Sequence, residues 1–259
     1  MRYFDGHSWT GYAVTAAPVA QPPVEHPVLP FPVVVGAIVI LFGSLVLQRP
    51  VIEELADRHV SVLLLMALAT IVGYGPSVLW MWFASRRWGT RRLLVDLGVR
   101  FRWSDLGWGP LVWVSTYLGL AVAVAVIQAF DVPYRGNLDV AGEIRSAGDP
   151  ERALVVSLII SAIVVAPVVE EALFRGLVMR GLLSTTAAPI AIVAQGLLFG
   201  AAHFQPDFGV DNIGLLAVLS LVGIGFGTGS YLLRRLGPAV IAHACFNTVA
   251  VIVLLVRVY

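Results

Sequence analysis

The stretch VVEEALFRG, residues 168–176, places three ionisable side chains close together in an otherwise apolar segment: Glu170, Glu171 and Arg175. An ionisable side chain near the middle of a membrane helix costs about 2.5–3.5 kcal/mol on insertion scales. Such residues are retained where they face a protein interior or a water-filled cavity, and they mark functional sites. If the surrounding chain spans a membrane, this stretch therefore lies at a functional centre.

The surrounding chain has the composition of a membrane protein. Its hydrophobic fraction is 58% and its charged fraction is 13%, whereas a soluble domain has about 45–50% apolar and about 25% charged residues. The apolar residues occur in long blocks, which predicts an all-α fold, a polytopic transmembrane helical bundle of about 7–8 spans. The predicted spans cover residues 33–48, 60–84, 109–130, 153–175, 187–204, 213–233 and 238–257, and an eighth arises if one of these is split.

The sixth predicted span is rich in glycine, at positions Gly223, Gly225, Gly227 and Gly229. Small residues let two helix backbones approach closely in lipid, so the pattern favours tight helix packing. A kinked or broken helix is the alternative that the glycines leave open.

Charge and cysteine content exclude several classes of function. The net charge is +1, so the chain has no basic stripe to neutralise phosphates, and we expect no nucleic-acid partner. The single cysteine, Cys245, excludes a disulfide within the chain and a cysteine-based metal cluster. The partner that the composition predicts is the lipid bilayer.

The N-terminal region differs from the rest of the chain. Residues 1–12 resemble the end of a small Trp-containing bacterial module that reads RYWDGxxWT, with Phe4 in place of its tryptophan. A disordered tail is the alternative interpretation. Residues 13–32 are rich in proline and are predicted to be an extended linker. Residues 33–259 form the predicted membrane domain, and we find no signal peptide in front of it.

Arginine placement predicts the orientation. The segment 85–108 contains Arg86, Arg87, Arg91, Arg92, Arg100 and Arg102. Cytoplasmic loops carry an excess of basic residues, so this segment and the N-terminus are expected to face the cytoplasm. We therefore expect a multi-pass protein of a bacterial inner membrane.

Two further predicted spans carry polar side chains. The fifth ends in LLFGAAHF, residues 197–204, and contains His203; the seventh contains AHACFNT, residues 242–248, with His243 and Asn247. Glu170 and His203 both lie roughly 22–26 Å from a turn expected near residues 184–187, so an antiparallel helix pair brings them to one depth. The polar groups of three helices are therefore predicted to meet.

The helical repeat predicts different roles for the two glutamates of the fourth span. Glu171 and Arg175 are four residues apart and share a face, so they are predicted to pair and support the site. Glu170 points about 100° away, which makes it the candidate reactive carboxylate. His243 and Asn247 also share one face. Gln195 is a weaker supporting candidate on the fifth span.

These groups suit the hydrolysis of an amide bond. Glu170 would take a proton from water, and His203 would orient the water or the carboxylate. His243 and Asn247 would donate hydrogen bonds to the oxyanion of a tetrahedral intermediate. The alternative is that Glu170, His203 and His243 bind Zn²⁺, although the HExxH spacing of soluble zinc peptidases is absent. The sequence leaves open whether the cofactor is zinc or none.

The three motifs together resemble a known family. EExxxR from residue 170, FxxxH from residue 199 and HxxxN from residue 243 are similar to the CPBP family, the CAAX-protease and bacteriocin-processing or Abi proteins. This family includes the type II CAAX prenyl endopeptidases, and the resemblance covers about residues 150–257. It implies a helical membrane fold and peptide-bond hydrolysis with Glu170 as the catalytic glutamate. It also implies that His203, His243 and Asn247 complete the site.

Two function classes remain open from the sequence. The leading hypothesis is an intramembrane endopeptidase that acts on a peptide or protein, lipidated or not, in CAAX-type cleavage or in bacteriocin or peptide processing. The alternative is a non-enzymatic membrane protein, either an immunity or scaffold homologue or a proton-coupled carrier that uses the same buried carboxylates.

Overall fold

The computed structural model describes residues 29–58, 60–136 and 152–258. The predicted N-terminal module, residues 1–12, and the predicted linker up to residue 28 lie outside the described residues. The helical elements are α1 (Phe31–Asp57), α2 (Val62–Trp88), α3 (Leu93–Asp96), α4 (Asp105–Ala129), α6 (Arg152–Ile160), η2 (Ser161–Val165), α7 (Ala166–Glu171), η3 (Ala172–Met179), α8 (Arg180–Leu183), α9 (Ala188–Ala201), η4 (Pro206–Asp211), α10 (Asn212–Leu233) and α11 (Gly237–Val258). Every element in the described part of the chain is helical, which confirms the predicted all-α bundle.

Membrane-length helices confirm most of the predicted spans. Within residues 29–58, 60–136 and 152–258, six segments are long and apolar enough to cross a bilayer: Phe31–Leu55, Leu63–Trp88, Asp105–Ala129, Val155–Leu183, Pro206–Leu233 and Gly237–Val256. The prediction of 187–204 as a full span is wrong, because α9 has only 14 residues. That is about 21 Å, less than the roughly 30 Å of a hydrocarbon core. The described part of the bundle therefore contains six helices of membrane length and the short α9.

A hydrogen-bonded turn ends α9 before it reaches full length. The Asn212 side chain accepts a hydrogen bond from Gln205 N at 2.9 Å and donates to Gln205 O at 2.7 Å and to Gly209 O at 3.1 Å. Gly209 adopts φ 51°, a left-handed conformation that glycine tolerates without strain. The chain thus reverses within residues 202–211 and enters α10.

The helix that carries VVEEALFRG is longer than predicted and is not a regular α-helix. It runs from Arg152 to Leu183, whereas the sequence predicted 153–175. Two segments within it, η2 and η3, have the wider π-helical turn. Such turns are rare and occur frequently at functional sites. Here they lie on either side of α7, the short segment that contains both glutamates.

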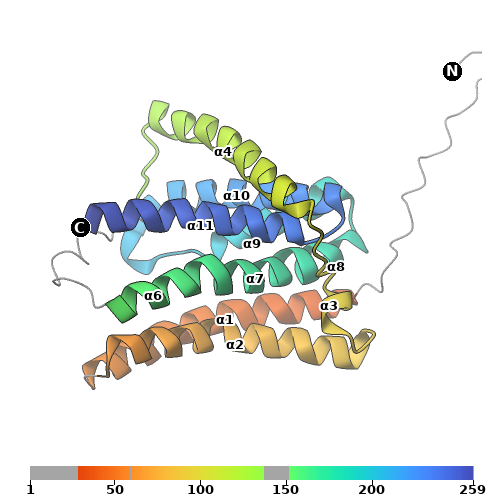
Figure 1. The fold of residues 1–259 in the computed structure, drawn as a ribbon, viewed down its shortest axis with the longest axis horizontal. Coiled ribbons are helices and arrows are strands. Elements are labelled where there is room, and N and C mark those ends of the chain that lie inside the picture. Colours follow the sequence, from red (N-terminus) through yellow and green to blue (C-terminus); the bar gives the residue numbers. More distant parts are fainter. Residues whose placement is uncertain (1–28, 59, 137–151, 259) are drawn as a thin grey trace, which may run out of the picture.

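This helix occupies the middle of the bundle. Figure 1 shows the run from α6 to α8 between the α1–α2 pair and the group formed by α9, α10 and α11. It contacts α1 and α2 on one side and α9, α10 and α11 on the other. α4 packs on the outside of this group, against α10 and α11. The charged side chains of the central helix therefore have protein neighbours in place of lipid.

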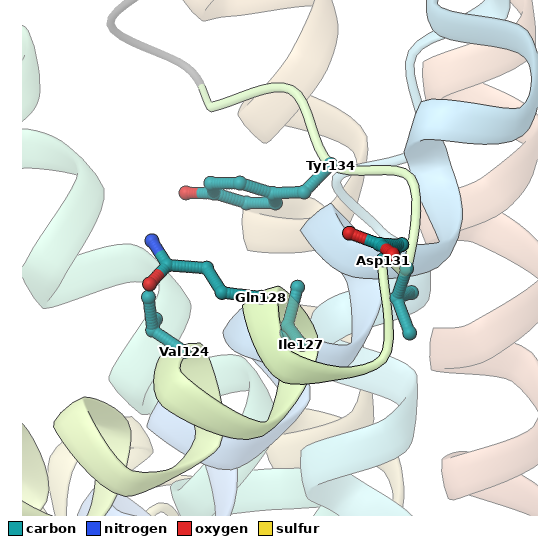
Figure 2. A pocket seen from close by; sticks show the side chains of 6 residues that line it. Val124, Ile127, Gln128, Asp131 and Tyr134 are labelled. Carbon is teal, nitrogen blue, oxygen red and sulfur yellow. The ribbon is translucent and has the colours of Figure 1, made fainter.

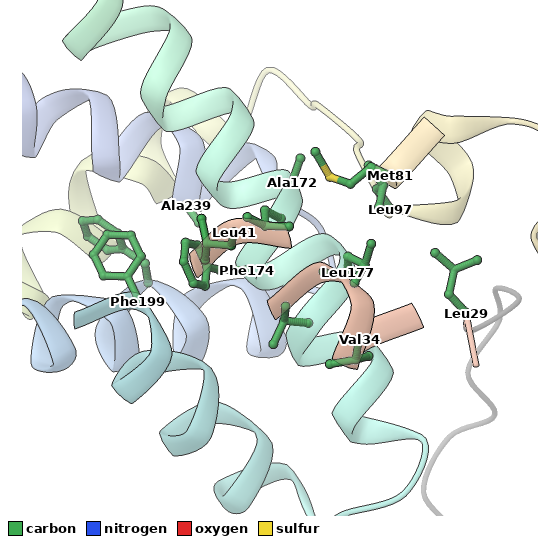
Figure 3. Close-up of a cluster of buried hydrophobic side chains, with 14 of the residues drawn as sticks. Leu29, Val34, Leu41, Met81, Leu97, Ala172, Phe174, Leu177, Phe199 and Ala239 are labelled. Carbon is green, nitrogen blue, oxygen red and sulfur yellow. The ribbon is translucent and has the colours of Figure 1, made fainter. Parts of the chain in front are cut away.

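Packed apolar side chains surround the central helix. Figure 3 shows Phe174 and Leu177 of η3 with Phe199 of α9, and with Val34 and Leu41 of α1. All five are buried. This cluster joins three helices that are distant in sequence, so it fixes the position of η3 in the bundle.

The outer faces of the long helices are apolar and exposed. Examples are Leu79, which is 66% exposed, Leu118 at 67% and Leu232 at 70%. Soluble monomers rarely expose continuous apolar patches of this extent. On helices of membrane length, these faces are the ones that contact lipid.

Arg100 and Arg235 lie at the same end of the bundle. Arg235 Nη2 lies 2.6 Å from the fully buried Asp105, and Gly237 N donates to Arg100 O at 3.2 Å. These contacts bring the segment before α4 and the turn before α11 together. The turn between α8 and α9 falls at residues 184–187, as predicted. Val34 of α1 lies against Gly181 of α8, so α1 begins at this end, as the predicted orientation requires.

The glycines of α10 make close helix contacts. A Cβ on Gly223 would lie 2.8 Å from Gly196 Cα of α9, and a Cβ on Gly225 would lie 2.4 Å from Thr116 Oγ1 of α4. α10 is continuous from Asn212 to Leu233. The structure therefore favours close packing over the alternative of a broken helix.

We expect Gly223→Ala to lower the thermal stability of the purified protein. The added methyl group would meet the α9 backbone, and overpacking of this kind costs about 1–3 kcal/mol. Gly119→Ala is the matched control, because a Cβ there meets nothing within 4 Å. Thermal unfolding in detergent measures both variants. Equal melting temperatures for the two would contradict the close contact of α9 and α10.

Candidate active site

A buried ion pair forms the base of the site. Arg175 Nη1 donates to Glu171 Oε1 at 2.8 Å, and both side chains have 0% exposure. The predicted pair of residues four apart is therefore confirmed. The same Glu171 Oε1 lies 3.0 Å from His243 Nδ1 of α11. One carboxylate oxygen thus joins the central helix to the helix that carries the second histidine.

Arg175 has partners on α9 and α10 as well. Its Nη2 donates to Gly223 O at 2.9 Å, and its guanidinium carbon lies 4.7 Å from the centre of the Phe199 ring. Gln195, which is completely buried, also donates to Gly223 O at 2.9 Å. A buried charge is tolerated only when it is paired and hydrogen-bonded. Both terminal nitrogens of Arg175 meet that condition, although its Nε has no partner among the described residues, and Gln195 shares the Gly223 carbonyl with Arg175.

Glu170 points to a different part of the bundle from Glu171. Tyr74 of α2 donates its hydroxyl to Glu170 Oε1 at 2.5 Å. Glu170 Oε2 lies 3.8 Å from His243 Nε2 and has no hydrogen-bond partner among the described residues. The Glu170 side chain is 13% exposed, against 0% for Glu171. Glu170, the predicted reactive carboxylate, is therefore the more exposed of the two, and its buried Oε2 is left without a protein partner among the described residues.

The neighbours of the His243 ring indicate which of its two nitrogens carries the hydrogen. Glu171 is held as a carboxylate by Arg175, so it can only accept, and we assign the hydrogen of the neutral ring to Nδ1. Nε2 then faces Glu170 Oε2 as an acceptor. Their separation of 3.8 Å is too long for a hydrogen bond. It suits one bridging water within about 2.6–3.2 Å of each group.

His203 joins this cluster through an aromatic ring. Its Nδ1 lies 2.8 Å from Phe199 O, which only accepts, so Nδ1 carries the hydrogen and Nε2 is the acceptor of the neutral ring. The His203 ring lies 4.8 Å from the Phe199 ring, which lies 5.8 Å from the His243 ring. Phe199 therefore contacts both histidines and Arg175.

Asn247 makes a contact that the sequence did not indicate. Its Nδ2 donates to Ala162 O of η2 at 2.7 Å. The π-helical turn changes the hydrogen-bond register of the helix, and the amide of Asn247 is a partner for one of its carbonyls. A second hydrogen on Nδ2 remains for another acceptor. Asn247 thus holds the central helix against α11, one turn away from His243.

The zinc alternative requires a set of converging ligands. A catalytic zinc site needs three protein ligands at about 2.0–2.2 Å from the ion. Among the parts of the chain that the structure describes, no group of three or more His, Cys, Asp or Glu side chains is arranged to hold a metal. Glu170 and His243 form a pair, and His203 is bonded to the backbone through Nδ1, which leaves its Nε2 free.

A separate pocket lies at the far end of α4. Its volume is about 380 Å³, and Figure 2 shows Gln128, Asp131 and Tyr134 at its edge. The remaining lining residues, Val124, Ile127 and Val132, are apolar. None of the candidate site residues lines this pocket.

Tyr74 is the site residue that sequence reasoning missed. It lies in the second predicted span, within the sequence GYGP at residues 73–76. A phenol hydroxyl in an apolar helix needs a hydrogen-bond partner. This need was the one signal in the sequence that pointed to Tyr74. The partner, Glu170, lies 96 residues away in the chain, so only the fold identifies it.

Comparison with known proteins finds one family model that matches the part of the chain carrying most of this site. Residues 152–249 match the family model described as type II CAAX prenyl endopeptidase Rce1-like, and the matched segment contains Glu170, His203, His243 and Asn247 but not Tyr74. No curated protein and no solved structure matches the chain. The match confirms the resemblance to CAAX proteases that the three motifs carry. Over residues 152–249 the chain is therefore similar to the Rce1-like type II CAAX prenyl endopeptidase family.

Proposed function

We propose that the protein is an intramembrane endopeptidase that hydrolyses a peptide bond with water activated by Glu170. The observation that supports this most strongly is the pair of facing acceptors, Glu170 Oε2 and His243 Nε2, 3.8 Å apart. A carboxylate and an imidazole that share one water form a general-base arrangement. The membrane-length helices around it are consistent with a substrate that enters from the bilayer.

In the proposed reaction, water bound between Glu170 and His243 attacks the carbonyl carbon of the scissile bond. Its proton passes to Glu170 Oε2 as the carbon–oxygen bond forms. The tetrahedral intermediate then collapses, the carbon–nitrogen bond breaks, and Glu170 returns the proton to the leaving amine. The products are a new carboxyl terminus and a new amino terminus.

The histidines and Asn247 support this reaction in different ways. Water donates one hydrogen to Glu170, and its second hydrogen is oriented by an Nε2 acceptor of neutral His243 or His203. His243 can donate to the oxyanion only as an imidazolium, and the Glu171 carboxylate at Nδ1 stabilises that form. The second Nδ2 hydrogen of Asn247 is a further oxyanion donor. The oxyanion role expected for His243 thus depends on its protonation.

The family description supports a CAAX-type substrate. We propose a peptide with a prenylated cysteine near its C-terminus, and cleavage on the C-terminal side of that cysteine. Bacteriocin or peptide processing is the other substrate class that the motifs allow. We also propose that the arginine-rich end and the N-terminus face the cytoplasm of a bacterial cell, as arginine placement predicts.

We expect the purified protein in lipid nanodiscs to cleave a farnesylated peptide of this type, and His203→Ala to cleave it at least roughly 100-fold more slowly. The reason is that water loses one of the groups that orient it. Gln128→Ala, in the separate pocket of Figure 2, is the control and should retain wild-type activity. Mass spectrometry of the products measures the rate.

The same peptide without its lipid separates the substrate classes. Preference for the lipidated peptide supports CAAX-type cleavage, and equal rates support general peptide processing. His203→Ala and wild type cleaving at the same rate would contradict the proposed site. If wild type cleaves neither peptide but moves a solute across vesicles, the non-enzymatic carrier is favoured.

A further inference from the structure

We propose that Tyr74 is a positioning residue that holds the Glu170 carboxylate in its reactive orientation. The proposal rests on the function proposed above. Tyr74 lies on α2, outside the segment that matches the family model. It therefore adds a residue from the first half of the chain to a site whose other members all lie between residues 152 and 249.

The carboxylate of Glu170 has two oxygens with different surroundings. Oε1 accepts the Tyr74 hydroxyl at 2.5 Å, whereas Oε2 faces His243 Nε2 at 3.8 Å and has no hydrogen-bond partner among the described residues. A carboxylate that is not held on one oxygen can rotate and exchange the two. The Tyr74 bond therefore selects the oxygen that meets the water.

The length of the Tyr74 bond, 2.5 Å, falls within the range of charge-assisted hydrogen bonds. O–H···O⁻ bonds have lengths of about 2.5–2.7 Å and are roughly twice as strong as neutral ones. The phenol hydroxyl is the donor, because a carboxylate only accepts. Tyr74 thus stabilises the ionised carboxylate that the reaction needs, and it does so without touching the substrate.

The surrounding packing gives this bond a fixed geometry. α2 contacts the central helix at α6 and at η3, on both sides of the segment that carries Glu170. Glu171, the next residue, is fixed from the opposite direction by Arg175 and His243. The two neighbouring carboxylates are therefore held by different helices, and catalysis is sensitive to errors of about 1 Å in such positions.

The test is Tyr74→Phe, with Tyr231→Phe as the matched control. The control removes the same hydroxyl from a 39% exposed position on α10. With the farnesylated peptide, we expect Tyr74→Phe to lower kcat roughly 10- to 100-fold, the effect of losing a hydrogen bond to a charged group. KM should change by less than about twofold, because the substrate does not contact the hydroxyl. The melting temperature should stay close to that of the control.

The outcomes separate this proposal from the proposed function. Equal kcat for Tyr74→Phe and Tyr231→Phe, with Glu170→Gln inactive, would overturn the positioning role and leave the peptidase intact. A loss of activity that follows only a loss of melting temperature would also overturn it, because Tyr74 would then be structural. Absence of cleavage by the wild-type protein would instead remove the proposed function itself, and full activity of Glu170→Gln would remove Glu170 as its general base.

Discussion

Glu170→Gln is expected to lower kcat by about 10²–10⁴-fold, the usual range for removing a general base. Glutamine keeps the size of the side chain, and its oxygen can still accept the Tyr74 hydroxyl. It cannot take a proton from the water between residue 170 and His243. The protein should therefore fold normally and bind substrate while hydrolysis fails. Cleavage of the farnesylated peptide under saturating conditions measures the effect.

The matched control is Glu53→Gln. Glu53 lies on α1 with a side chain that is 60% exposed and paired only at the surface with Arg49. Its substitution should leave kcat at the wild-type value. If Glu170→Gln cleaves as fast as Glu53→Gln, then another group activates the water and the assignment of Glu170 is wrong.

Arg175→Met is expected to destabilise the protein by about 3–5 kcal/mol, because it leaves the buried Glu171 carboxylate without its cation. The guanidinium also bonds to Gly223 O and stacks on Phe199, so its removal loosens the contacts of η3 with α9 and α10. The expected readout is a strongly lowered melting temperature or poor recovery in detergent.

A double variant separates stability from catalysis at this pair. Glu171→Leu with Arg175→Met replaces both charges by apolar groups, and such replacements are often neutral for stability. We expect the melting temperature to recover while cleavage stays lost, because His243 Nδ1 no longer has its carboxylate. An active double variant would show that Glu171 does not act through His243.

The exposed pair on α1 provides the matched control for this experiment. Arg49 and Glu53 are also four residues apart and lie 2.6 Å from each other, with side chains 47% and 60% exposed. Arg49→Met removes this pair and the exposed contact of Arg49 with Asp207, and it should leave the melting temperature nearly unchanged, since exposed pairs contribute little. If the two arginine variants unfold at the same temperature, the buried pair has no special role in the fold.

Local properties of the chain were predictable from sequence. The ends of α10 and α11 and the turn at residues 184–187 follow from where apolar blocks stop. The Glu171–Arg175 pair follows from the helical repeat. Placing Glu170 near His243 needed one additional argument, that buried charges on separate helices must share an interior.

Features that depend on packing were not predictable. The π-helical turns of η2 and η3 have no signature in the apolar pattern, and they determine which carbonyl meets Asn247. The early end of α9 depends on the hydrogen bonds of Asn212, eleven residues beyond Ala201. The contact of Tyr74 was not predictable for a similar reason, because its partner, Glu170, lies on a helix far along the chain.

The measurement that tests the central claim most directly is hydrolysis of the farnesylated peptide in heavy-oxygen water. The account predicts that wild-type protein releases a product whose new carboxyl terminus carries one heavy oxygen atom, with no covalent intermediate in a single turnover. Glu170→Gln should release none above background. A covalent peptide–enzyme adduct, or labelled product from Glu170→Gln at the wild-type rate, would contradict water activation by Glu170 beside His243.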